Sequence, residues 1–115
     1  RAAAVAPASV SVVQGDRIAQ IDLEPAVTGG TTMHVTITSP GGGLSDRADE
    51  ITVTARMPAE GVGPIDIDTT VAGPNHVTTN SADFPIAGVW EIIVTARYGE
   101  FDQVVFTGQL TVQQR

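Results

Sequence analysis

The chain has 115 residues, of which 42% are hydrophobic and 17% charged, a balance typical of one folded globular domain. Its formal net charge is −7 and none of its six basic residues is a lysine. Nucleic acid and anionic lipid are therefore not expected as partners, because both would repel an acidic surface. The absence of cysteine excludes disulfides, thiolate metal sites and thiol nucleophiles.

The first eight residues are rich in alanine and too short for a secretory or membrane-crossing segment. We expect residues 1–8 to be a linker or the remnant of a processed N-terminus. No internal repeat or second domain is evident in the rest of the chain. Residues 9–115 are therefore expected to form a single domain.

Alternation of apolar and polar residues, which indicates β-strands with one buried face, continues to residue 113. The segments with this pattern are 9–13, 17–23, 31–38, 50–57, 65–70, 89–97 and 103–113, with an irregular segment at 75–86. Turn signals rich in glycine and proline lie at 28–30, 40–43, 61–64, 73–75 and 98–100. The pattern predicts an all-β, immunoglobulin-like or fibronectin-like β-sandwich of about seven strands.

Parity within each segment divides the side chains between an inward and an outward face. The expected core residues are Met33, Val35, Ile37, Ile51, Val53, Ala55, Met57, Ile65, Ile67, Val77, Phe84, Ile86, Trp90, Ile92, Val94, Ala96, Val104, Phe106, Leu110 and Val112. Met33 and Met57 are thioethers, which Cu(I) prefers as ligands, but on an inward face methionine ordinarily fills a core.

His34 and His76 are the only histidines, and parity places both on outward faces. Two surface imidazoles with a carboxylate as third ligand are a donor set for Cu(II) or Zn(II), so both are candidate metal ligands. The alternative is two unrelated surface histidines, because their separation in the sequence is not a metal-ligand spacing. In an immunoglobulin-like topology their strands could be neighbours in one sheet, and in register the imidazoles would then be close enough to share an ion. We nevertheless expect the two to be too far apart.

Carboxylates gather in three places, at Asp46, Asp49 and Glu50, at Asp66 and Asp68, and at Glu100 and Asp102. None of these groups has the ligand spacing of a calcium loop, so a solvated acidic rim is expected. There is no Gly-x-Ser-x-Gly elbow, and neither histidine has a local catalytic partner in the sequence. We do not expect the chain to be an enzyme.

Several short motifs follow one another in a characteristic order between residues 18 and 113. They are Leu-Glu-Pro-Ala at 23–26 with Gly-Gly at 29–30, Met-Pro-Ala-Glu-Gly-Val-Gly-Pro at 57–64, Ala-Gly-Pro-Asn-His at 72–76, Gly-Val-Trp-Glu-Ile at 88–92, and Glu-Phe-Asp-Gln at 100–103. Together they resemble the extracytoplasmic β-sandwich domain of bacterial, actinobacterial-type copper-transport and copper-resistance membrane proteins of the CopC/CopD type.

The resemblance implies an extracytoplasmic, membrane-associated accessory domain of a copper-transport or copper-resistance protein, which either binds copper weakly or supports the membrane part without binding it. It also implies a partner, either the membrane-embedded part of the same protein or another copper-handling protein. The His-led N-terminus with which CopC domains hold Cu(II) is missing, so the resemblance carries over no metal ligand. The alternatives are a generic cell-surface immunoglobulin-like module for protein–protein contact without metal, and a Ca²⁺-stabilised adhesin-like domain.

Overall fold

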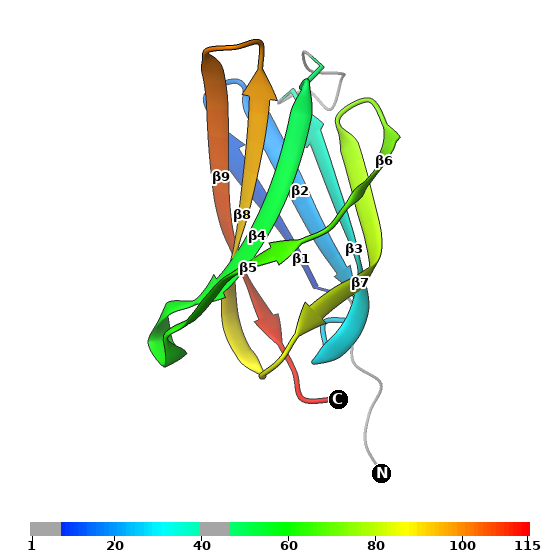
Figure 1. The fold of residues 1–115 in the computed structure, drawn as a ribbon, viewed down its shortest axis with the longest axis vertical. Coiled ribbons are helices and arrows are strands. Elements are labelled where there is room, and N and C mark those ends of the chain that lie inside the picture. The colour runs from blue at the N-terminus through cyan, green and yellow to red at the C-terminus, as the bar shows by residue number, and fades with distance from the viewer. Residues whose placement is uncertain (1–7, 40–46) are drawn as a thin grey trace.

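The computed structural model describes residues 8–39 and 47–115, which form nine strands in two antiparallel sheets (Figure 1). The elements in chain order are β1 (Ala8–Gln14), β2 (Arg17–Glu24), β3 (Gly29–Thr38), β4 (Glu50–Met57), the short 3₁₀ helix η1 (Pro58–Glu60), β5 (Val62–Ile67), β6 (Thr70–Gly73), β7 (His76–Phe84), β8 (Gly88–Tyr98) and β9 (Asp102–Val112). One sheet has the strand order β1-β2-β3-β7-β6 and the other the order β5-β4-β8-β9. No helix in the described residues has the length and apolarity needed to cross a bilayer.

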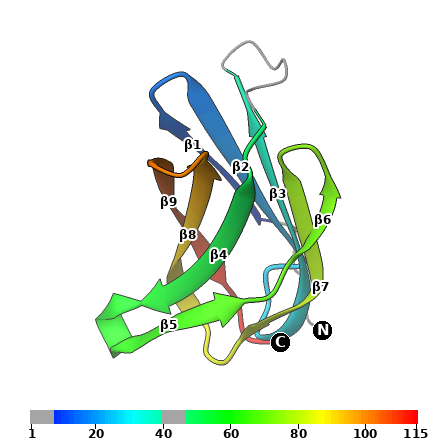
Figure 2. The same cartoon turned by 45° about the horizontal axis from the view of Figure 1, so that its top comes forward.

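The predicted all-β sandwich is confirmed, but it has nine strands in the described residues where about seven were predicted. The difference arises between residues 61 and 86. The strand that begins at Val62, inside a predicted turn, leaves one sheet after Ile67 and joins the other as β6 (Figure 2). The irregular segment 75–86 contains the continuous strand β7. The immunoglobulin-like or fibronectin-like connectivity stays a prediction.

Two predicted boundaries also shift. Ala8, expected to end the linker at 1–8, is the first residue of β1, and residues 1–7 lie outside the described part of the chain. Gly29 and Gly30, expected in a turn, begin β3, where the carbonyl of Gly30 accepts a hydrogen bond from Arg115 Nη2 at 2.8 Å. The turn predicted at 40–43 and Asp46 also lie outside the described residues.

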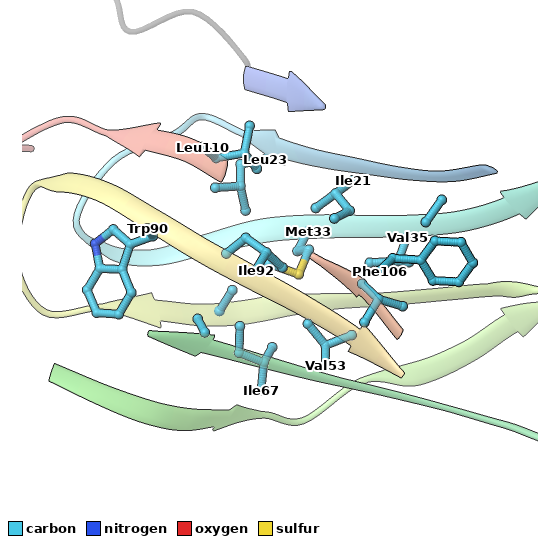
Figure 3. Packing of buried hydrophobic residues seen from close by; sticks show 14 of the residues in the cluster. Ile21, Leu23, Met33, Val35, Val53, Ile67, Trp90, Ile92, Phe106 and Leu110 are labelled. Atoms are coloured by element: carbon cyan, nitrogen blue, oxygen red, sulfur yellow. The ribbon is translucent and has the colours of Figure 1, made fainter. Parts of the chain in front are cut away.

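The core fills the space between the two sheets, as the alternation predicts (Figure 3). Trp90 is fully buried against Phe84, with ring centroids 5.3 Å apart in an edge-to-face arrangement. Its indole N–H donates to the carbonyl of Ile86 at 2.9 Å, so the burial of this polar atom is compensated. Among the expected core residues, Ile86 is exposed, and Ile51, Ile65 and Val104 are only partly buried against the core.

The first and last strands close one side of the sandwich. β1 is an edge strand of one sheet and β9 an edge strand of the other, and they lie against each other (Figure 1). Gly108 of β9 makes this approach possible, because a Cβ there would stand 2.9 Å from methyl carbons of both Val10 and Val12. The opposite side is formed by the single run of chain through β5 and β6, which passes from one sheet to the other (Figure 2).

Candidate functional site

The two histidines come together on the outer face of one sheet. His34 is in β3 and His76 in β7, which are hydrogen-bonded neighbours. In their register His34 pairs with Thr78 and His76 with Thr36, so the imidazoles stand on a diagonal. Their ring centroids are 5.7 Å apart and their planes are inclined by 39°. The expectation that they would be too far apart to share an ion is therefore wrong.

The spacing fits coordination of one ion by both rings. A metal–nitrogen bond of about 2.0 Å places the centroid of a coordinating ring about 3 Å from the ion. Two centroids 5.7 Å apart can thus reach the same ion from two sides. Both residues are half-buried, which limits the rotamer freedom that they would lose on binding an ion.

Asp22 of β2 places a carboxylate beside this pair. It lies directly opposite His34 in the β2–β3 register, where side chains on one face are about 5 Å apart at Cβ. The side-chain amide N–H of Gln20 donates a hydrogen bond to Asp22 Oδ1 at 3.1 Å. On the far side, His76 faces Gly73 of β6, which has no side chain to cover the ring.

The donor set is therefore two imidazole nitrogens with one nearby carboxylate. Within residues 8–39 and 47–115, no three or more His, Cys, Asp or Glu side chains are already arranged as a metal-binding group. An ion bound by His34 and His76 would take its remaining ligands from water, or from Asp22 after a change of rotamer.

The methionines take no part in this site. Met33 and Met57 are 0% and 2% exposed and belong to the core, as their parity predicts. Met33 neighbours His34 in sequence, but successive side chains of a strand point to opposite faces. Any metal bound at the imidazole pair therefore lacks a thioether ligand from Met33.

Met33→Leu and Met57→Leu should each lower the free energy of unfolding by less than about 1.5 kcal/mol, because leucine nearly conserves the volume of methionine. Met33→Ala, which leaves a cavity, should cost about 2–5 kcal/mol and serves as the contrasting variant. Urea unfolding followed by circular dichroism measures all three. Loss of copper binding in either leucine variant, with the fold intact, would contradict the assignment of these side chains to the core.

The acidic groups are dispersed around the described surface. Asp49 Oδ2 accepts a hydrogen bond from the backbone N–H of Gly99 at 2.6 Å, and Glu50 lies 3.5 Å from the Arg97 guanidinium.

Asp66, Asp68 and Asp83 line a small hollow of about 110 Å³. Glu100 and Asp102 are exposed beside the β8–β9 turn. In the described part of the chain these carboxylates do not gather into a calcium-type ligand group.

Sequence reasoning missed the role of Asp22 and the proximity of the two imidazoles. The alternation in segment 17–23 is compatible with an outward-facing Asp22, but it does not identify β3 as the strand beside it. Only the sheet order supplies that information.

A comparison of the chain with protein-family models, curated proteins and solved structures found no match.

Proposed function

We propose that this chain is an extracytoplasmic copper-handling domain that binds Cu(II) through His34 and His76. The observation that carries this proposal is the 5.7 Å separation of the two imidazole rings on one solvent-facing surface. The net charge of −7 adds a long-range attraction for a cation.

The donor chemistry favours Cu(II) over the other copper state. Imidazole nitrogen with carboxylate or water oxygen suits the tetragonal geometry of Cu(II), and divalent copper binds such donors more tightly than other first-row divalent metals. Cu(I) prefers thiolates and thioethers. The chain has no cysteine, and both methionines are in the core.

The fold order is consistent with the domain type that the motif resemblance implies. The neighbours β2-β3-β7-β6 facing β4-β8-β9 correspond in order to the A-B-E-D and C-F-G sheets of an immunoglobulin constant-type sandwich, with β1 added at one edge and β5 at another. This correspondence supports an immunoglobulin-like topology. By the resemblance, the domain works on the outer side of a membrane, beside the membrane-embedded part of the same protein or another copper-handling protein.

Isothermal titration of the protein with Cu(II) tests the metal site. We expect binding by the wild type and its loss in the His34→Ala/His76→Ala double variant. The control is the double variant Thr32→Ala/Asn80→Ala, which removes a hydrogen-bonded polar pair from the same two strands and should bind as the wild type does. Binding should also weaken on acidification, because protons compete with the metal for the imidazole nitrogens.

Electron paramagnetic resonance of the Cu(II) complex gives an independent readout, since coupling to imidazole nitrogen should appear in the wild type and disappear in the histidine double variant. Asp22→Asn separates the role of the carboxylate, and we expect weaker binding with the nitrogen coupling retained. Equal heats from the wild type and the histidine double variant, or none from either, would end the proposal.

A further inference from the structure

The first half of β4 has a strand partner on one side only. Glu50–Thr52 pair with residues 95–97 of β8, whereas pairing with β5 begins only at Val53, opposite Ile67. The cause is the passage of the chain from β5 into the other sheet at β6, which draws it away from β4 (Figure 2). In the described part of the chain, no strand pairs with the other edge of Glu50–Thr52.

A groove lies where the two strands diverge. It has a volume of about 550 Å³ and is lined by Glu50, Thr52 and Thr54 of β4 and by Asp66, Asp68 and Thr69 of the departing chain. A second hollow of about 300 Å³ shares Glu50 and Ile51 with it and extends to Val71 and His76 of the opposite sheet. The groove thus lies along β4 and the departing chain, and the second hollow beside it reaches the opposite sheet.

Apolar side chains from both layers are incompletely covered at this place. Ile51 is on the inward face of β4, yet it is only partly buried. Val71 of β6 pairs with the buried Val77 and so shares its inward face, but it is 69% exposed. Inward-facing valine and isoleucine are ordinarily covered by the opposite sheet. Within residues 8–39 and 47–115, no strand lies beside Glu50–Thr52, on the edge away from β8, to cover Val71 from the facing sheet.

The rim of the groove is acidic. Glu50, Asp66 and Asp68 lie along it. Among the described residues, only Glu50 of these three has an arginine within ion-pair distance, and both side chains of that pair are exposed. These carboxylates disfavour a second copy of this acidic chain in the groove, as charges on strand edges do generally. They favour a segment of opposite charge.

We propose that this groove binds an extended segment of a partner protein in which apolar and basic residues alternate. The segment adds to the sheet as a strand beside Glu50–Thr52, so that backbone hydrogen bonds complete the β4 edge. Its apolar side chains cover Ile51 and Val71, and its basic side chains meet the carboxylates of the rim. This binding mode does not depend on the proposed metal site.

A synthetic peptide serves as the probe, with blocked ends, alternating valine and arginine, and about eight residues to match the length of a strand. Titration into the metal-free protein, followed by calorimetry and amide NMR shifts, should show binding that weakens as salt is added. The shifted amides should centre on Glu50–Thr52. Two matched peptides act as controls: one has glutamate in place of arginine, and one has N-methylated amides on the edge that would face β4. Neither should bind.

The variant Val71→Arg places a positive charge in the second hollow, beside the groove, at an already exposed side chain, so the fold should tolerate it. We expect it to weaken peptide binding about tenfold or more through like-charge repulsion. The control is Val13→Arg, an equal change at another exposed valine, 60% accessible, beside the β1–β2 turn. It should leave the affinity within a factor of about two, since exposed charges far apart are screened by salt.

Several results would overturn the proposal. They are the absence of binding by the arginine peptide, equal binding of the glutamate or N-methylated peptide, and equal effects of Val71→Arg and Val13→Arg. Sedimentation provides the remaining arm. If the chain alone forms a dimer that Val71→Arg dissociates, the occupant of the groove is a second copy of the chain and not a partner segment. All of these measurements use the metal-free protein, so a negative result here says nothing about the proposed metal site.

Discussion

Replacing Trp90 by alanine should lower the free energy of unfolding by about 3–5 kcal/mol. The indole is fully buried, packs edge-to-face on Phe84, and lies between the two sheets (Figure 3). The truncation removes the largest buried side chain and leaves a cavity that the surrounding strands can fill only in part. For a domain with a typical stability of about 5–15 kcal/mol, this is a large fraction of the total.

Urea unfolding followed by far-ultraviolet circular dichroism measures this effect without relying on the tryptophan that is removed. Trp90→Phe is the contrasting variant, because it keeps an aromatic ring but loses the indole N–H that bonds to the Ile86 carbonyl. We expect it to cost about 1–3 kcal/mol. A cost below about 1 kcal/mol for Trp90→Ala, with an unchanged denaturant slope, would show that the indole is not a central part of the core.

Replacing Gly108 by alanine should cost about 1–3 kcal/mol through overpacking. The new methyl group would stand 2.9 Å from a methyl carbon of Val10 and another of Val12, and 3.4 Å from Ile21 Cδ1. Valine is stiff at χ1, so its methyl groups cannot swing away and β1 must shift outward. The gain from a less flexible unfolded chain offsets only about 0.4–1 kcal/mol of this cost.

Two comparisons isolate the clash. Gly30→Ala introduces the same methyl group in another strand, where nothing lies within 4 Å of the new atom, and should change stability by no more than about 0.5 kcal/mol. Combining Gly108→Ala with Val10→Ala should cost less than the sum of the two single changes, because removing the valine methyls relieves the contact. Additive costs in this cycle, or equal costs at Gly30 and Gly108, would exclude close packing of β1 on β9 as the cause.

In the segments where a buried face was predicted, residue alternation identified it. The pattern in segments 31–38 and 89–97 placed Met33, Val35, Trp90 and Val94 inward, and all four are buried. This success has a local cause, because side chains alternate along every strand whatever its neighbours are. Ile86 departs from the expectation because it lies between β7 and β8, where no strand fixes its parity.

The candidate sites were less predictable because they depend on neighbours. His34 was assigned correctly to an outward face, yet nothing near it in the sequence identifies His76 as its companion. The groove beside β4 was also beyond prediction, since the pattern at 65–70 does not show that the chain changes sheets after Ile67. Each feature depends on which strands lie side by side.

The sequence by itself therefore determined the class of fold, the inward and outward faces, and the acidic surface without cysteine, all of which follow from composition and from the two-residue period of a strand. Only the tertiary structure decided that β3 pairs with β7, that β1 packs on β9, and that β4 keeps an unpaired edge. Strand pairing is decided by long-range packing of all nine described strands together, and so the partners of His34, Gly108 and Glu50 were settled by the assembled sandwich.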